Sequence, residues 1–442
     1  MGLLRCPRSG LPLRLDAWER DGADVAYGVL TSEAGRWPVL AGIPVFTGHV
    51  ESALARFDQR RLDDAVSEAA FGPFPHARGR SQLQALANSG HSGRALASIT
   101  RRLADRDRRA DARVIQAGCD NPMALLEHAY LTSRNATPDA YAYFRYRYSS
   151  PRHLVALSVS EALAVEPAPL LDLGCGAGQL TWAFAKRHGE GGVVGLDASF
   201  VQLLVGRQFA GDDVQLVCGD ATSLPFATGA FRATIAVDVL SFITDKVSAV
   251  REAQRVLTRA GLLAVTSVKN ALASHVFAGE PLTPSGWAAL PEGWQTSVIA
   301  DEQIVRRYFE GQGMPAADAV DAAAVPGTQL VSLLAARQEP LPDGGILDGQ
   351  PHARGPLAVN PLYAPVDSEP GSVSYELRFP AGSYRPDNPL MESYLPATFR
   401  LSRETLVQAR GGRRPEELRQ AIAATAVLAL PERYPGERWP GL

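Results

Sequence analysis

The stretch "PLLDLGCGAGQLTWAFA", Pro169–Ala185, decides the fold of this chain of 442 residues. Its first part is an apolar run interrupted only by Asp172, which is typical of a β-strand buried on both faces. Gly174, Gly176 and Gly178 follow directly, and a helical pattern opens after them. Glycines at this point let the backbone turn tightly and approach a ligand, while the start of a helix offers free N–H groups. The stretch therefore predicts a strand, a ligand-binding loop and a helix.

Strands and helices alternate regularly between Pro169 and Gln338. This alternation predicts an α/β fold with a doubly wound, Rossmann-like parallel sheet and helices on both faces. Asp301–Phe309 is expected to be a helix, and Asn270–Ala300 an insertion rich in Pro, Gly and Trp. The expected strands are Leu170–Leu173, Gly192–Leu196, Gln215–Cys218, Thr234–Asp238, Leu262–Ser267 and Gln329–Ala335.

The spacing of the glycines indicates which ligand the loop binds. A dinucleotide loop reads GxGxxG and would need glycine at Gln179, whereas here the spacing is GxGxG, preceded by Asp172. This pattern resembles that of the class I S-adenosylmethionine-dependent methyltransferases. The family's later segments follow in order as "CGDATSLPF" (Cys218–Phe226), "FRATIAVDVLSFITD" (Phe231–Asp245) and "EAQRVLTRAGLLAVT" (Glu252–Thr266). The resemblance implies S-adenosylmethionine as the cofactor.

The resemblance also implies which residues bind the cofactor. Asp197 would accept both ribose hydroxyls, because an acid about 20 residues past such a loop is where a nucleotide ribose lies. Asp220 would take the adenine amino group, and the Ala221 N–H a ring nitrogen. The implied set is Asp172, Gly174, Gly176, Gly178, Asp197, Ala198, Asp220, Ala221, Asp238, Tyr146 and Tyr148.

The chain departs from the family pattern at two places. Thr258–Gly261 stands where the family usually has Lys-Pro-Gly-Gly, and Arg232 stands where it often has Asp. Neither position touches the cofactor in the family's usual geometry, so cofactor binding is still expected.

The cofactor's sulfonium is already a good electrophile, so the protein must chiefly align the acceptor and exclude water. Tyr146 and Tyr148 belong to the aromatic cluster of "DAYAYFRYRYSSPRH", Asp139–His153. Such a cluster is usually core or interface, but its place just before the glycine loop also suits a lid. Rings near the positive sulfur would add cation–π attraction. In the Asn270–Ala300 insertion, Trp287 and Trp294 are expected to cover the acceptor.

Three residues are candidate catalytic bases for an acceptor that must lose a proton. They are His153, His275 and Asp238, and each has a simpler alternative. His153 could cap the helix that starts at Pro151, His275 could lie on the surface, and Asp238 could hydrogen-bond the cofactor's methionyl end.

The first fifty residues alternate short β-prone stretches with turns. Leu3–Leu15 and Gly28–Phe46 resemble the small zinc-ribbon-derived module of the methyltransferase-activator family. That pattern opens with CPxC, where this chain has Cys6-Pro7-Arg8-Ser9, and its second ligand pair would fall near Ser32–Gly35, which lacks cysteine. Structural zinc needs four S or N ligands. We expect the module without the metal.

Composition shifts divide the chain into five expected parts. These are a zinc-ribbon-like module at 1–50, a helical connector at 51–150, the cofactor-binding domain at 151–338, a Pro- and Gly-rich linker at 339–356 and an α+β extension at 357–442. In the extension, Ser374–Phe379 is β-prone and Arg413–Leu430 is expected to be helical. No pattern indicates what the extension does.

Charge and cysteine usage exclude several classes of protein. The formal net charge is −3, so no chain-wide field would hold a nucleic acid. The run Arg101–Arg113 is interrupted by three aspartates at helical spacing, which favours a solvated helix face. Four cysteines without a CxxC pair, and no long apolar run, predict a cytoplasmic protein without disulfides, signal peptide or membrane span. A homodimer remains open.

We therefore expect a methyltransferase that acts on the oxygen or carbon of a small-molecule acceptor, with secondary metabolism as the favoured source of that acceptor. The fourth strand ends in Asp238-Val239-Leu240-Ser241, not in the Asn/Asp-Pro-Pro-Tyr of enzymes that methylate nucleobase or amide nitrogens. Three alternatives stay open: an rRNA or tRNA methyltransferase, an enzyme that uses the cofactor's aminobutyryl arm, and a cofactor-binding scaffold that activates a partner.

Overall fold

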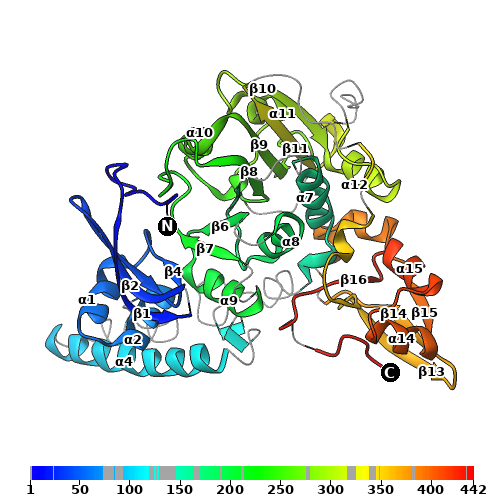
Figure 1. Ribbon diagram of the computed structural model, residues 1–442, viewed down its shortest axis with the longest axis horizontal. Coiled ribbons are helices and arrows are strands. Elements are labelled where there is room, and N and C mark those ends of the chain that lie inside the picture. Colours follow the sequence, from blue (N-terminus) through cyan, green and yellow to red (C-terminus); the bar gives the residue numbers. More distant parts are fainter. Residues whose placement is uncertain are drawn as a thin grey trace.

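The computed structural model describes residues 2–22, 24–72, 84, 93–118, 124–125, 127–128, 146–163, 169–189, 192–210, 214–274, 279–315, 325–337, 345–347, 349–380, 382, 384–434 and 436–442. Figure 1 shows a central sheet (green) with an N-terminal sheet and helices (blue and cyan) on one flank and a C-terminal part (orange and red) on the other.

The central sheet has seven strands in the order β10-β11-β9-β8-β5-β6-β7. From β7 to β9 neighbouring strands are parallel, whereas β11 runs antiparallel to both β9 and β10. This arrangement confirms the predicted Rossmann-like α/β fold. The strands are β5 (Leu170–Leu173), β6 (Val193–Asp197), β7 (Gln215–Cys218), β8 (Phe231–Val237), β9 (Leu257–Lys269), β10 (Gln295–Ala300) and β11 (Leu330–Ala336).

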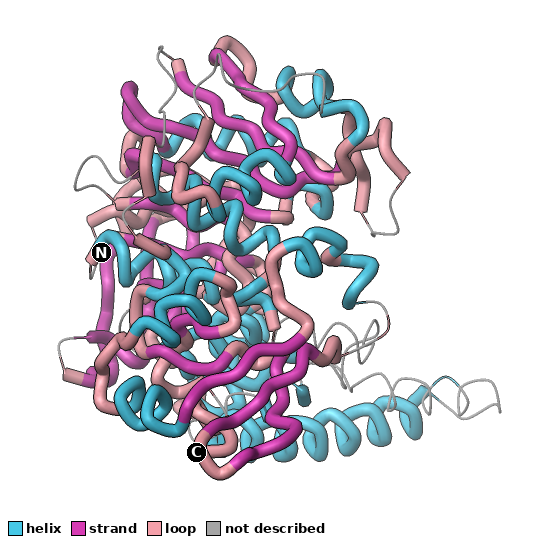
Figure 2. The backbone as a smooth tube through the Cα atoms, turned by 90° about the vertical axis from the view of Figure 1, so that its right-hand side faces the viewer, coloured by secondary structure: helices cyan, strands magenta, loops and turns pink. Residues whose placement is uncertain are grey.

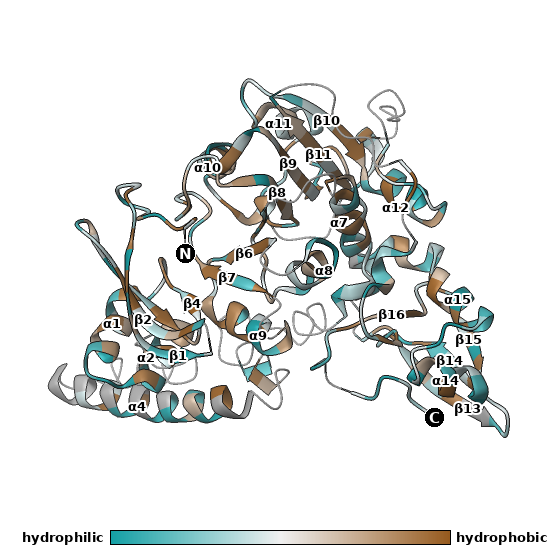
Figure 3. Ribbon diagram, viewed as in Figure 1, coloured by the Kyte–Doolittle hydropathy of each residue, from teal (hydrophilic) through white to brown (hydrophobic). Residues whose placement is uncertain are grey.

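Helices cover both faces of this sheet, whose apolar strands form the brown centre of Figure 3. On one face α7 (Pro151–Ala162), α8 (Gln179–His188) and α12 (Asp301–Phe309) share one buried apolar cluster with the strands. On the other face α10 (Lys246–Val256) packs in a cluster that also contains Trp37 of the N-terminal sheet. The helix α9 (Phe200–Ala210) packs against the N-terminal helices.

The N-terminal part is a four-stranded antiparallel sheet followed by helices. Its order along the sheet, β1-β2-β3-β4, follows the sequence, so each strand pairs with the next through a short turn. The elements are β1 (Arg14–Asp21), β2 (Asp24–Ser32), β3 (Gly35–Leu40), β4 (Ile43–Pro44), α1 (Val50–Asp58), α2 (Leu62–Phe71) and α4 (Gly93–Gly118).

This N-terminal sheet is joined to the outer edge of the central sheet. Val45 forms a parallel bridge with Cys218, and the Phe46 N–H donates to the Cys218 carbonyl at 2.8 Å. Near the start of the chain, Leu4 bridges Phe226, and the Ala227 N–H donates to the Leu3 carbonyl at 2.9 Å. At Cys218 this side of β7 is thereby paired within the chain.

The helix α4 contains the Arg-rich run and projects from one end of the molecule (Figure 2). Its arginines 102, 106, 109 and 113 are exposed, as expected. The expectation for the acidic residues was wrong, since Asp107 and Asp111 are both buried. Asp111 accepts hydrogen bonds from the Ser67 hydroxyl of α2 at 3.1 Å and pairs with His128 at 2.8 Å. This carboxylate fastens α4 to its neighbours.

The C-terminal part contains a two-stranded and a three-stranded antiparallel sheet. The hydroxyls of Tyr384 and Tyr394 fasten it to the segment just before α7, where they donate to the carbonyls of Tyr146 and Ser149 at 2.8 and 2.7 Å. Its elements are β12 (Leu357–Val359), β13 (Tyr363–Glu369), β14 (Ser372–Leu377), α13 (Tyr384–Asp387), β15 (Thr398–Ser402), α14 (Arg403–Arg410), α15 (Glu416–Ala423) and β16 (Val427–Ala429).

Among the residues that the structure describes, no helix combines the length and the apolar character that a membrane crossing needs.

Candidate functional site

The glycine loop leaves the carboxyl end of β5 in a backbone conformation that side chains disfavour. Gly174, Gly176 and Gly178 have φ angles of 75°, 57° and 70°, all in the left-handed region. The N–H groups of Gly174 and Cys175 donate to the Leu196 carbonyl of β6 at 2.7 and 3.0 Å, which anchors the loop to the next strand. Gly178 then caps α8.

The space around the loop is as restrictive as its backbone. A Cβ atom on Gly174 would lie 2.3 Å from Cγ2 of Val239, which is far below van der Waals contact. Beneath the loop, a Cβ on Gly206 of α9 would lie 3.0 Å from the Ala177 carbonyl oxygen. Glycine is therefore required at 174 for both reasons, and the loop is held between β8, β6 and α9.

Asp197 links the glycine loop to the end of β6. Its Oδ2 accepts the Gly176 N–H at 2.9 Å, and its Oδ1 accepts the Ser199 N–H at 2.8 Å. Burial raises the pKa of this carboxyl, while the hydrogen bonds from Ser199, Gly176 and Ala198 oppose the shift. The side chain is half-buried, and Ala198 beside it is exposed. A carboxylate fixed at the carboxyl end of β6 can accept further hydrogen bonds from a ligand.

Asp172 lies below the loop and is buried. Its Oδ2 accepts the Thr181 hydroxyl of α8 at 2.6 Å. Burial raises its pKa to about 6, against the opposing hydrogen bond from Thr181. In this position Asp172 joins β5 to α8, so it supports the loop from beneath.

Asp220 and Ala221 follow the carboxyl end of β7. The Asp220 carboxylate is exposed, and its Oδ1 accepts both the N–H and the hydroxyl of Thr222 at 2.8 Å. These bonds fix the orientation of the side chain. The Ser223 hydroxyl donates to the Pro7 carbonyl at 3.1 Å, so the N-terminal part also holds this turn.

Asp238 follows the carboxyl end of β8 and has a φ of 54°, which is unusual for a residue with a side chain. Its Oδ2 lies 3.2 Å from Nε of Arg152, a buried residue of α7. The Arg152 guanidinium also donates to Oδ1 of Asn388 at 3.2 Å. Asn388 of the C-terminal part thus contacts the Arg152–Asp238 ion pair at the edge of the central sheet.

A buried acid lies close to this pair. Asp301, the first residue of α12, accepts the Ser267 hydroxyl at 2.6 Å and the Ser332 hydroxyl at 2.7 Å. Burial raises its pKa to about 6; the two serine hydroxyls and Arg152 oppose the shift, and Asp238 adds to it. Ser267 has a φ of 57° within β9, a second strained residue at this edge of the sheet.

The structure places the remaining candidate residues less favourably for catalysis. His153 is buried, and burial followed by Arg147 and His352 lowers its pKa to about 3, so it is neutral near pH 7. The cap of this helix is Ser150, whose hydroxyl accepts the His153 N–H at 3.3 Å, so the alternative that His153 itself caps the helix was wrong. His275 lies outside the described residues.

The two tyrosines pack between α7, α8 and the C-terminal part. The Tyr148 ring is buried, with ring centroids 6.2 Å from Trp182 and 5.6 Å from Tyr434. Tyr146 is half-buried, and its ring lies 6.2 Å from that of Tyr384. These contacts are typical of a core cluster, which is the usual role of such aromatic runs. The remaining aromatic residues of the run lie outside the described residues.

The Asn270–Ala300 insertion was expected to cover an acceptor through its tryptophans, and this was wrong for Trp287. The Trp287 ring, in α11 (Pro284–Ala289), is buried and its Nε1–H donates to the Lys269 carbonyl at 2.8 Å. The insertion ends in β10, so it completes the edge of the sheet.

Sequence reasoning missed Arg152, Asp301 and Asn388. Arg152 carries a weak local signal, since it is a charged residue at the start of a largely apolar helix. Asp301 carries none, because its helix also contains Glu302, Arg306 and Arg307. Asn388 gives no signal, because it lies 236 positions from its partner. Among the described residues, no three His, Cys, Asp or Glu side chains gather closely enough to hold a metal ion.

The buried acid gives a pH-dependent prediction. The folded pKa of Asp301 is about 6 and the unfolded value is about 3.9, so the folded state binds this proton more tightly. Binding of that proton therefore adds to the free energy of unfolding of the parent protein below about pH 4. This contribution is lost as the pH rises through 6. Asp301→Asn cannot ionise, so its free energy of unfolding should rise relative to the parent by about 2 kcal/mol between pH 4.5 and 7.5.

Urea unfolding at these two pH values measures the difference. The matched control is Glu302→Gln, the exposed neighbour on the same helix. If Asp301→Asn differs from the parent by the same amount at both pH values, Asp301 does not hold a proton in the way its surroundings indicate.

Sequence comparison identifies similar proteins for the segment that contains this loop. Residues 171–265 match the family described as "Methyltransferase domain". A malonyl-[acyl-carrier protein] O-methyltransferase from Legionella pneumophila is 34% identical over 108 residues, which are 24% of this chain and 38% of that protein. The ubiquinone/menaquinone biosynthesis C-methyltransferase UbiE of Hahella chejuensis is 38% identical over 104 residues, 22% of this chain and 42% of that protein. The chain spans about two fifths of the length of these curated relatives.

Solved structures give a more distant likeness. A chain from the complex between the Haloferax volcanii Trm112 methyltransferase activator and a methyltransferase aligns with a TM-score of 0.33 and 20% identity, over 46% of this chain and 96% of that chain. The [4+2]-cyclase SpnF aligns with a TM-score of 0.32 and 22% identity, over 43% of this chain and 82% of that chain. The match to the methyltransferase domain rests on residues 171–265 alone, the part that carries the glycine loop, Asp197, Asp220 and Asp238.

Proposed function

We propose that this protein binds S-adenosylmethionine and transfers its methyl group to the oxygen or carbon of a small organic acceptor. The carboxylate of Asp197 carries the proposal, because it is fixed by two backbone N–H groups at the edge of a loop in which a Cβ has no room. The matched methyltransferase domain supports the cofactor, and the named activities of the relatives support a small acceptor.

The residues at the sheet edge fit the parts of this cofactor. Gly174–Gly178 would let the backbone approach it closely. Asp197 would accept the ribose hydroxyls, Asp220 the adenine amino group through the oxygen that does not hold Thr222, and Asp238 would face the methionyl end. The bound cofactor supplies a methyl group on a sulfonium, which is electrophilic without activation. The protein's remaining task is to orient the acceptor and keep water out.

The acceptor side is proposed to lie at the carboxyl ends of β8 and β9, where doubly wound sheets bind ligands. Asp238, held by Arg152, is the preferred candidate for contact with the acceptor or the cofactor. His153 is a weaker candidate base, since its low pKa leaves little affinity for a proton. His275 remains an untested candidate.

The first fifty residues are proposed to be a zinc-ribbon-like module that has lost its metal. The Cys6 thiol is hydrogen-bonded by Ser32 and Ser9. Three positions at which the family's pattern would place zinc ligands, Cys6, Ser9 and Ser32, therefore lie close together. Burial alone would raise the pKa of this thiol, but these hydrogen bonds and two from the backbone lower it below its usual value. Hydroxyl groups thus stand where further thiolates would be needed for zinc.

Calorimetry with S-adenosylmethionine and S-adenosylhomocysteine tests the proposal. Both ligands should bind to one site, since they share the adenosine that Asp197 and Asp220 would hold. Incubation with small phenols and carboxylic acids, followed by product analysis, tests the transfer. S-adenosylhomocysteine is the expected product. Methylthioadenosine would instead indicate use of the aminobutyryl arm, and absence of affinity for either ligand would remove the proposal.

A further inference from the structure

A series of polar side chains crosses the central sheet at the carboxyl ends of β8 and β9 and leads to Asp238. It begins at Asp301, which directly follows β10. The Asp301 carboxylate accepts the hydroxyls of Ser267 in β9 at 2.6 Å and of Ser332 in β11 at 2.7 Å. The Ser332 hydroxyl in turn accepts the Ser267 N–H at 3.3 Å. All three side chains are buried, so these bonds are shielded from water.

These hydrogen bonds hold an irregularity in the pairing of β9 with β11. Two residues of β9, Thr266 and Ser267, stand opposite the single residue Ser332 of β11, which makes a β-bulge. Ser267 has a φ of 57°, a conformation that residues with side chains disfavour. Its bonds to Asp301 and Ser332 stabilise this conformation. Bulges of this kind redirect a strand and occur often beside functional sites.

The bulge is joined directly to Asp238. The Asp238 N–H donates to the Thr266 carbonyl at 2.9 Å, one residue before Ser267. On the other side, the Asp238 carboxylate lies 3.2 Å from Nε of the buried Arg152. Besides burial and the two serine hydroxyls, the charges of Arg152 and Asp238 also act on the pKa of Asp301. Asp301 is therefore linked to Asp238 both through the backbone of β9 and through nearby charges.

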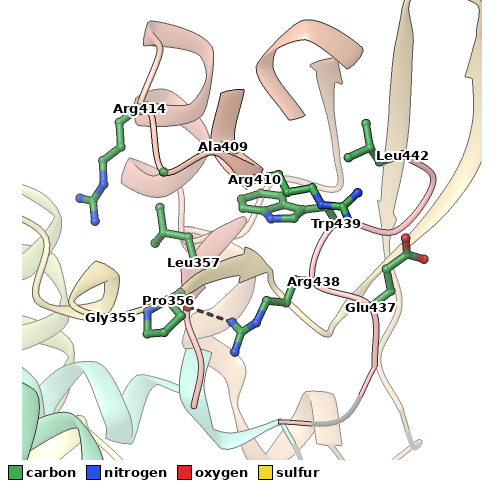
Figure 4. A pocket seen from close by; sticks show the side chains of 11 residues that line it. Gly355, Pro356, Leu357, Ala409, Arg410, Arg414, Glu437, Arg438, Trp439 and Leu442 are labelled. Carbon is green, nitrogen blue, oxygen red and sulfur yellow. Dashed lines mark hydrogen bonds between the residues drawn. The ribbon is translucent and has the colours of Figure 1, made fainter. Parts of the chain in front are cut away.

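The charged side chains of a cavity in the C-terminal part show no such convergence. Arg410 and Arg414 line this cavity of about 530 Å³ and extend to opposite sides of it (Figure 4). Arg438, which also lines it, donates to the Pro356 carbonyl at 3.0 Å. The polar groups at the sheet edge, by contrast, are connected to one carboxylate, that of Asp238.

We propose that Asp301 is a positioning residue that directs the Asp238 carboxylate toward the aminobutyryl arm of S-adenosylmethionine. This inference rests on the proposed function, in which Asp238 faces the methionyl end of the cofactor. Asp301 holds the bulge, the bulge holds the backbone of Asp238, and Arg152 holds its carboxylate. The arm carries an ammonium group, and a carboxylate that is already fixed in direction binds it with less loss of conformational freedom.

Calorimetry on the full-length protein with a matched pair of ligands tests this role. S-adenosylhomocysteine carries the arm, whereas methylthioadenosine shares the adenosine and the thioether but lacks the arm. Asp301→Ala removes the acceptor of both serine hydroxyls. Asp301→Asn keeps one acceptor and gains a donor, to which the hydroxyls can adapt by rotation. Ser267→Ala removes one link and leaves Asp301 bonded to Ser332. Glu302→Ala, at the next and exposed position of α12, is the control.

Asp301→Ala should weaken binding of S-adenosylhomocysteine by about tenfold or more and that of methylthioadenosine by less than about twofold. Asp301→Asn should return the affinity for S-adenosylhomocysteine to within about threefold of the parent, and Glu302→Ala should equal the parent. Ser267→Ala should show the same selective loss in smaller measure, and it decides the question if Asp301→Ala does not fold. In an Asp238→Ala background, Asp301→Ala should cause no further loss, because its effect passes through Asp238.

Equal losses of both ligands in Asp301→Ala and Ser267→Ala would show a structural role only and would overturn the inference. Parent-like affinity for S-adenosylhomocysteine in both variants would do the same, as would a full further loss in the Asp238→Ala background. Failure of the parent itself to bind S-adenosylhomocysteine is a different result, because it removes the proposed function and this inference with it.

Discussion

Gly174→Ala is expected to abolish measurable binding of S-adenosylmethionine and to lower the melting temperature of the protein strongly. Gly174 has a φ of 75°, and the new Cβ would lie 2.3 Å from Cγ2 and 2.8 Å from Cβ of Val239. The left-handed backbone alone costs an alanine about 1 to 2 kcal/mol. The contact with Val239 adds a larger cost, which the loop can relieve only by moving away from β8. That movement would displace the backbone that the cofactor is expected to meet.

Gly189→Ala is the matched control for this substitution. Gly189 closes α8 with a φ of 82°, and a Cβ there would meet no atom within 4 Å. It should show only the backbone cost and retain cofactor binding. A second variant, Gly174→Ala with Val239→Ala, should recover part of the binding, because both γ carbons are removed. Calorimetry and thermal unfolding measure the effects, and similar losses at Gly174 and Gly189 would refute the role given to Val239.

Asp197→Ala is expected to weaken S-adenosylmethionine binding ten- to a hundredfold. The substitution removes the charge-assisted hydrogen bonds to the ribose, each of which contributes about 1.5 to 3 kcal/mol. It also leaves the N–H groups of Gly176 and Ser199 without their present acceptor, so the loop loses an internal support. S-adenosylhomocysteine should lose affinity by a similar factor, because the ribose is common to both ligands.

Asp245→Asn is the control for a general effect of charge. Asp245 is an acid at the start of α10 whose carboxylate caps the Ser248 N–H at 3.0 Å. Its loss should leave both affinities within twofold of the parent. Should Asp197→Ala bind both ligands as the parent does, the proposed ribose site would be misplaced, even if the fold is intact.

Local sequence was sufficient to predict the centre of the fold. Leu170–Leu173 and Gln215–Cys218 are strands with the expected limits, and Asp301–Phe309 is the expected helix. These segments are apolar runs or amphipathic repeats bounded by turn residues, so their structure depends on nearest neighbours. The positions of Gly174 and Asp197 followed from the same local pattern, because parallel strands bring their carboxyl ends to one edge.

Contacts between distant segments explain where the sequence failed. Arg413–Leu430 was expected to be one helix, yet α15 ends at Ala423, Thr425 adopts a φ of 53°, and β16 follows. The strand β16 exists because it pairs with β12, about seventy residues earlier in the chain. Pairing at this separation overrides the helical preference of an alanine-rich segment.

The charged cluster under the proposed acceptor site was missed for the same reason. Arg152, Asp238 and Asp301 stand on three separate elements, and the positive φ angles of Asp238 and Ser267 have no signature in the amino-acid pattern. Only the folded chain brings these groups together, and only there does burial raise the pKa of Asp301.

The union of the N-terminal sheet with β7 limits how this molecule can associate with others. An uncovered border strand offers its unused amide and carbonyl groups to any extended peptide, which is how many proteins recruit partners or aggregate. Here Val45 and Phe46 already occupy that ladder at Cys218. A foreign segment could dock at that position only after displacing a piece of the protein's own backbone. The backbone partner that a second polypeptide could otherwise supply to Cys218 is therefore a segment of the same chain.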